Sequence, residues 1–137
     1  MKRMSAKIIM VLSFCFIFGV SSSFAFEALT IVEPMNYTTV SSPVKVCMKA
    51  WGVQVEPAKK GVNPKKGHNH ILIDTALPSD LSKPIGKDAQ HVHMGDGSTC
   101  KTLKLSAGKH SITALFAQGN HVPFNPPLSD TVVINVK

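Results

Sequence analysis

The sequence contains few aromatic residues and few carboxylates. Among 137 residues there are one Trp and one Tyr, and 8 acidic residues stand against 15 Lys and Arg, which gives a net charge of +7. The lysines are scattered along the chain and are not interleaved with aromatic side chains. Binding of single-stranded nucleic acid depends on aromatic stacking within a basic groove. We therefore expect no nucleic acid partner.

The sequence also lacks an apolar run long enough to span a membrane. The longest run, residues 8–20, falls short of the roughly twenty residues that a spanning helix needs. It follows a basic head and precedes Ser23 and Ala25, small residues at the positions that a signal peptidase reads. This pattern is typical of a secretory signal peptide. We predict that residues 1–25 are cleaved, and that residues 26–137 form a single periplasmic or secreted domain with no membrane span.

Cysteine is scarce. Of three cysteines, Cys15 lies in the predicted signal peptide, so Cys47 and Cys100 remain. An even number of cysteines in an oxidising compartment favours a disulfide over a thiolate metal site. Each cysteine lies on the polar face of its own predicted strand, which argues against a bridge across the core. We expect the two strands to be neighbours in one sheet, with the bridge on its outer face.

Helical periodicity is almost absent after residue 25. Short runs of alternating apolar and polar residues are separated by Pro, Gly, Asn and Ser at intervals of about ten residues, a pattern typical of β-sandwiches. We predict an all-β domain, an immunoglobulin-like antiparallel β-sandwich of about seven strands. The expected strands are residues 29–33, 44–51, 69–74, 90–94, 98–105, 109–118 and 131–136.

The six histidines all fall between residues 68 and 121. Two His-x-His pairs are the main feature, His68 with His70 and His91 with His93. Residues two apart in a strand project from the same face, so two pairs on adjacent strands would supply four nitrogens, enough for zinc or copper. His121, in a Gly- and Pro-containing loop, is placed to reach the rim. We predict these five histidines as ligands of a copper or zinc ion, with copper favoured.

Three further residues are secondary candidates for the metal site: His110, Asp74 and Met94. Asp74 offers a hard oxygen ligand and Met94 a soft thioether, and imidazole with thioether suits copper better than calcium or magnesium. Alternation along residues 69–74 directs Ile71 and Ile73 to the core and the histidines and Asp74 away from it. No organic cofactor is expected.

The alternative is a non-catalytic structural or interaction module of the cell envelope, with an envelope protein as partner. In that hypothesis the histidines form a hydrogen-bonded network that stiffens one end of the sandwich. Catalysis is the less favoured class, because no serine or cysteine nucleophile stands in a recognisable setting. We assign no catalytic residue, although a metal-bound water with Asp74 as base would support hydrolysis.

Four segments carry a resemblance to a known family: residues 67–74 (GHNHILID), 91–97 (HVHMGDG), 107–111 (AGKHS) and 120–127 (NHVPFNPP). They resemble the successive motifs G-H-H-H-L-L-I-D, H-I-H-F-G-x-G, P-G-K-H-T-L and H-x-P-H-x-P-P of a family of small exported bacterial domains of unknown function. The resemblance implies an exported β-sandwich and implies no established activity. Asn69 and Phe124 stand where that pattern has histidine. A site that needs every histidine of the family pattern would be incomplete in this chain, whereas a site built from the six histidines present here would be complete.

Overall fold

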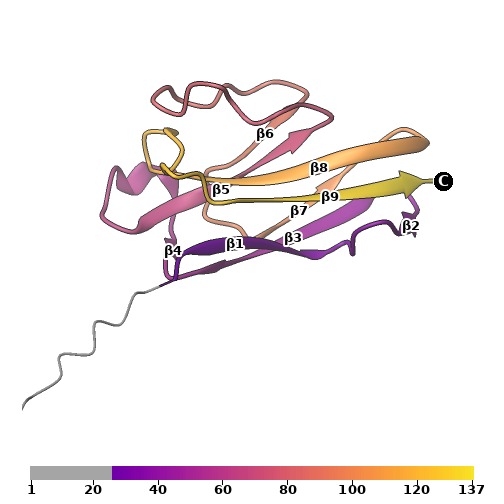
Figure 1. The fold of residues 1–137 in the computed structure, drawn as a ribbon, viewed down its shortest axis with the longest axis horizontal. Coiled ribbons are helices and arrows are strands. Elements are labelled where there is room, and N and C mark those ends of the chain that lie inside the picture. The colour runs from indigo at the N-terminus through magenta and orange to yellow at the C-terminus, as the bar shows by residue number, and fades with distance from the viewer. Residues whose placement is uncertain (1–25) are drawn as a thin grey trace, which may run out of the picture.

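The computed structural model describes residues 26–137, so the predicted signal peptide lies outside the described residues. Nine strands and one short 3-10 turn form two stacked sheets (Figure 1). The elements are β1 Ala28–Glu33, β2 Thr39–Val40, β3 Val44–Trp51, β4 Gln54–Val55, η1 Ala58–Lys60, β5 Lys66–Ile73, β6 His91–Met94, β7 Cys100–Leu103, β8 Gly108–Ala117 and β9 Ser129–Val136.

The strand order is that of an immunoglobulin-like sandwich. One sheet has the order β1-β3-β7, and the other has the order β2-β9-β8-β5, with β4 and β6 both paired to the free edge of β5. Pairing is antiparallel except for β2 with β9 and β4 with β5. In the immunoglobulin fold the first, second and fifth strands share one sheet and the third, sixth and seventh share the other, and the long strands here follow this division. The fourth long strand, β6, pairs with β5 and so belongs to the second sheet. The predicted all-β sandwich is confirmed.

All seven predicted strands are present; β3 has the predicted bounds, and the other six differ from their predicted bounds at one end or both. They correspond to β1, β3, β5, β6, β7, β8 and β9. The two additional strands, β2 and β4, have two residues each and lie in stretches predicted as a turn and a loop. β5 begins at Lys66, three residues earlier than predicted, because β4 pairs with its first residues and Glu56 N donates to Gly67 O at 2.7 Å.

Alternation along β5 separates two apolar clusters. Ile71 lies in the main core between the sheets, with Val46 of β3 and Ile112 of β8. Leu72 points to the opposite, outer face, where it packs on Leu115. Burial of large aliphatic side chains on both faces of one strand is typical of a strand covered from both sides.

Two connections cover the outer face of β5. The β5–β6 connection places Ile85 against Leu72 and Leu115, and the β8–β9 connection carries His121. Ile85 N donates to His121 O at 2.8 Å, so the two connections are joined over the sheet. In Figure 1 both loops lie on the side of the six-stranded sheet that faces away from β1 and β3. Side chains under these loops are therefore shielded from water.

Cys47 and Cys100 form a disulfide. They are directly opposed in the antiparallel pair of β3 and β7. Val46 and Met48 of β3 belong to the core between the sheets, so Cys47 lies on the other face. The prediction that two neighbouring strands of one sheet carry the bridge is confirmed.

Across residues 26–137, no helix is both long and apolar enough to cross a membrane.

Removal of the disulfide should lower the free energy of unfolding by about 4 kcal/mol. The bridge closes a loop between residues 53 apart, and the chain-entropy relation gives this value for such a loop. Denaturant unfolding of the protein and of its Cys47→Ser, Cys100→Ser variant measures the difference. A loss below about 1 kcal/mol would contradict this account of the bridge.

Candidate metal centre

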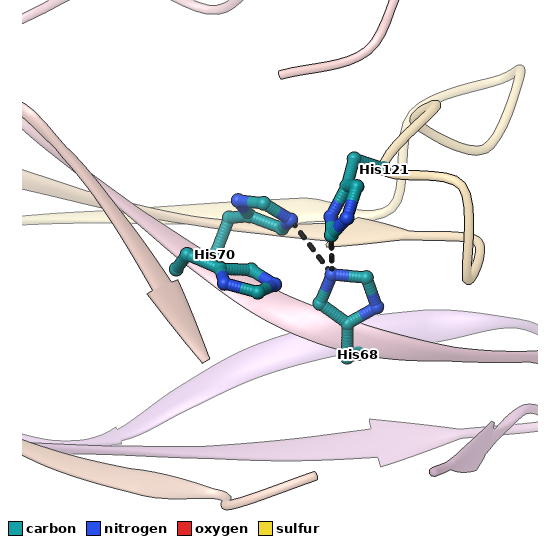
Figure 2. A group of neighbouring side chains, drawn as sticks. His68, His70 and His121 are labelled. Atoms are coloured by element: carbon teal, nitrogen blue, oxygen red, sulfur yellow. Dashed lines mark hydrogen bonds between the residues drawn. The ribbon is translucent and has the colours of Figure 1, made fainter. Parts of the chain in front are cut away.

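Four histidines from three segments meet under the covering loops. His68 and His70 come from β5, His93 from β6 and His121 from the β8–β9 connection. One nitrogen from each ring can be chosen so that all four lie within 4.8 Å of one another. Figure 2 shows His70 and His121 directed towards His68. We call these four residues the histidine cluster.

Strand register brings the two β-strand segments of the cluster together. His70 stands directly opposite His93 in the antiparallel pair of β5 and β6, and directly opposed residues project from the same face of a sheet. On the other side of β5, His68 stands opposite Ala117 of β8. The small side chain of Ala117 leaves room for the His68 ring.

His121 enters the cluster from a tight turn. Its N–H donates to Gln118 O at 2.8 Å, and Gln118 N donates to Val122 O at 2.9 Å. His121 has φ = 67°, a left-handed conformation that is uncommon for residues other than glycine. The turn places His121 Nδ1 3.1 Å from His68 Nε2.

Two glycines make space for the cluster. A Cβ on Gly95 would overlap the His93 ring, so the absence of a side chain there lets the imidazole fold back over its own strand end. A Cβ on Gly119 would overlap the carbonyl of Gly61, so glycine permits the His121 turn to pack against the segment after η1. Both glycines therefore act on the position of a cluster ring.

Contacts within the cluster converge on one nitrogen. His68 Nε2 lies 3.1 Å from His121 Nδ1 and 3.0 Å from His70 Nε2 (Figure 2). A ring nitrogen of neutral imidazole carries either one hydrogen or one lone pair, so His68 Nε2 can make one good hydrogen bond and not two. Hydrogen bonding alone does not satisfy this arrangement, whereas a cation among the lone pairs would.

Three buried ring nitrogens have no hydrogen-bond partner among the described residues: His68 Nδ1, His70 Nδ1 and His93 Nε2. Buried polar atoms are almost always paired, and exceptions call for an explanation such as an ion. His93 Nε2 is accounted for if it is a ligand. The Nδ1 atoms of His68 and His70 lack the outer partners that usually orient a ligating histidine.

The cluster resists protonation. Burial, followed by the neighbouring rings of His121 and His93, lowers the pKa of His68 to about 4. Burial and the surrounding histidines lower the pKa of His70 to about 3. The pKa of His93 is also lowered, by burial, His121 and Lys87, against an opposing effect of Asp96. At neutral pH these three rings are uncharged, the form that binds metal.

A small cavity opens onto the cluster. Its volume is about 140 Å³, and its lining residues are His70, Ile85, Gly86, Lys87, His93 and His121. His68 does not line the cavity and is fully buried beneath the other rings. The cluster is therefore closed at His68 and open to the cavity beside His70, His93 and His121.

His91 lies outside the cluster, although it shares a strand face with His93. It stands opposite Leu72, and its Nδ1 is 2.8 Å from Asp88 Oδ1. It lines a different, larger cavity formed by the β5–β6 connection. The structure thus brings together four of the five main candidates.

The secondary candidates also lie elsewhere. Met94 is buried in the core between the sheets, on the face opposite His93. Asp74 follows the last residue of β5, and its positive φ of 53° turns the chain away from the strand direction there. There it accepts a 2.7 Å hydrogen bond from His110 Nδ1, while His110 Nε2 lies 2.9 Å from Ser106 O. His110 and Asp74 form a separate pair, and its contacts raise the pKa of His110.

The two departures from the motif pattern do not touch the cluster. Asn69 alternates with His68 and His70 and therefore points to the other face of β5, where its Nδ2 donates to Ser98 O at 3.2 Å. Phe124 packs against the core and against Phe116, with ring centroids 5.4 Å apart. Neither replacement removes a nitrogen from the four.

The fold and the cluster define an all-β domain with a buried histidine centre. The chain belongs to a family described as a domain of unknown function, DUF4399, whose model matches residues 46–137. The matched range includes both disulfide cysteines and all six histidines.

No curated protein matches the chain. Among solved structures, it is similar to the endo-beta-1,4-mannanase from Thermotoga petrophila, with 10% sequence identity and a TM-score of 0.48. That match covers 86% of this chain and 21% of the mannanase chain. The chain spans about a fifth of that protein's length, and the match carries no argument about activity.

The free energy of unfolding should fall as the pH is lowered from about 6.5 to about 4. In this window the unfolded chain takes up protons at His68 and His70, whose pKa values in the fold are about 4 and about 3. Stability therefore rises with pH across the window. Since one pKa unit corresponds to about 1.4 kcal/mol, we expect a loss of at least roughly 2 kcal/mol. Urea unfolding at a series of pH values measures it.

The matched control is His110, whose pKa is raised in the fold. The stabilisation that His110 contributes is fully present below its pKa in the unfolded chain and is lost as the pH rises. The variant His110→Gln should therefore still lose stability as the pH is lowered from about 6.5 to about 4. The double variant His68→Gln, His70→Gln should reduce that loss. A pH profile unchanged by the double variant would show that the cluster does not cause it.

Proposed function

We propose that this protein is an exported domain that binds one transition metal ion through His68, His70, His93 and His121, with copper favoured over zinc. The observation that carries the proposal is the convergence of His121 Nδ1 and His70 Nε2 on His68 Nε2, at 3.1 and 3.0 Å. With metal–nitrogen bonds of about 2.0–2.1 Å, neighbouring ligand nitrogens lie about 3.3–3.4 Å apart in a tetrahedral zinc site and about 2.8–3.0 Å apart in the square-planar geometry typical of Cu(II). The two short contacts fall between these separations.

The ligand chemistry supports a transition metal. Imidazole nitrogen suits copper and zinc, whereas calcium and magnesium prefer oxygen, and the cluster contains no carboxylate. Copper is favoured because nitrogen sites bind Cu(II) more tightly than Zn(II) in the general order of divalent metals. The lowered pKa values of His68, His70 and His93 support it too, since protons compete weakly for those rings.

Export is the second part of the proposal. It is supported by the signal-peptide pattern of residues 1–25 and by the disulfide between Cys47 and Cys100, because disulfides persist in oxidising compartments. A periplasmic location would expose the site to metal without the competing thiols of the cytoplasm.

The competing hypothesis is a structural or interaction module of the cell envelope. Its supporting observations are the hydrogen-bonded pairs of His110 with Asp74 and of His91 with Asp88, which show that other histidines in this chain have structural partners. In that case the cluster would only tie the covering loops to β5, and the untagged protein would bind no metal. The metal titration below separates the two hypotheses.

Untagged protein should bind one equivalent of Cu(II), and His93→Ala should abolish that binding or weaken it by at least tenfold. Isothermal titration calorimetry measures both, because loss of one of four ligands costs well over about 1.4 kcal/mol, or a factor of ten. The matched control is His91→Ala, which removes the other imidazole of the same strand face and should retain the affinity. Equal losses in both variants, or no binding tighter than about 10 μM in the parent protein, would contradict the assignment.

Gly95→Ala extends this test without removing any ligand. Its new methyl group would overlap the His93 ring, so the ring must move and copper affinity should fall. Retention of full affinity would show that the His93 position is not required. Measuring the free energy of unfolding of this variant separates loss of the site from loss of the fold.

A further inference from the structure

The histidine cluster provides no negative charge to balance a bound metal cation. The four ligands are neutral imidazoles, so a divalent ion among them would keep its charge of +2 in a buried setting. Burying an uncompensated charge is costly, and the cost falls when an opposite charge lies beside it. Asp96, the acidic residue closest to His93 in sequence, is exposed, and its Oδ1 accepts hydrogen bonds from Ser98 N and Oγ.

The cavity over the cluster gives such a group a way in. Its 140 Å³ lie over His70, His93 and His121, on the open side of the site. This volume leaves room for a ligand of a few non-hydrogen atoms beside the rings. The wall formed by Ile85 is fixed by the hydrogen bond from its N–H to His121 O. A small ligand can therefore reach His70, His93 and His121 from this side.

Lys87 lines the same cavity. A cationic side chain beside a cation site is unfavourable, because like charges repel. The interaction becomes favourable if an anion lies between the two positive charges, because each of them attracts the anion. Lys87 is exposed to solvent, and an anion in the cavity would lie between its charge and the charge of the metal ion.

We propose that the cavity lined by Lys87 is a subsite for a small anion, such as a halide, azide or a short carboxylate, that coordinates the metal held by the histidine cluster. This inference rests on the proposed function, since it needs the metal to be bound. It adds the class of exogenous ligand, the open side from which that ligand approaches and the residue that attracts it.

The test is an azide titration of the untagged, Cu(II)-loaded protein, followed by the azide-to-copper charge-transfer absorption. Azide should bind, and Lys87→Gln should weaken it at least about fivefold, as loss of one nearby charge at intermediate dielectric predicts. Copper affinity, measured first by calorimetry, should not fall in this variant.

The matched control is Lys83→Gln, which removes the same charge from the same connection. Lys83 pairs with Asp80 at 3.1 Å and lines the neighbouring cavity, so its loss should leave azide affinity unchanged. Equal weakening by both variants would assign the effect to net charge and overturn the role of Lys87. Copper uptake without azide binding would overturn the subsite alone, whereas absence of copper uptake would overturn the proposed function and the subsite with it.

Discussion

Burial of His68 and His70 on β5 is the constraint on which the rest of the structure depends. Both side chains are almost inaccessible to water, and burying polar groups without full hydrogen bonding costs free energy. The outer face of β5 could have carried aliphatic residues, as it does at Leu72. Instead, His68 Nε2 lies close to His70 Nε2 and His121 Nδ1 under the covering loops, and the Nδ1 atoms of both buried rings have no hydrogen-bond partner among the described residues. In the proposed function, a metal ion bound at the Nε2 atoms would offset part of this cost.

The rest of the sandwich holds these rings in place. The core between the sheets anchors β5 through Ile71, and β6 brings His93 opposite His70. The His121 turn is joined to the β5–β6 connection by the Ile85 hydrogen bond. The disulfide reinforces the other sheet, well removed in the strand order from the cluster. Ligands on strands are positioned more precisely than ligands on loops, and three of the four here are on strands.

Alternation in the sequence predicts much of this arrangement. It assigns Ile71 to the core and His68 and His70 to the other face, because successive side chains in a strand point in opposite directions. The same rule places the two cysteines on neighbouring strands rather than across the core. Applied to His93, it would also have separated Met94 from the site, since adjacent residues of a strand cannot share a face.

Other features depend on contacts that no local pattern encodes. His91 and His93 have the same parity, and only the register with β5 and the nearby Asp88 separate them. Strand alternation assigns Asp74 to the face of His70, but β5 ends at Ile73 and Asp74 has a positive φ, so it pairs with His110 instead. The two-residue strands β2 and β4 form because of the long-range partners β9 and β5. The role of Gly95 follows from the His93 ring conformation, which spacing does not reveal.

We propose that four particular imidazoles form one metal centre. Anomalous diffraction at the copper edge from crystals of the untagged protein soaked in Cu(II) tests it most directly. The account predicts one strong anomalous peak, bounded by His68, His70, His93 and His121, with density from each ring. A strongest peak at His91 with Asp88 or at His110 with Asp74, or no ordered copper at full soaking, would contradict it.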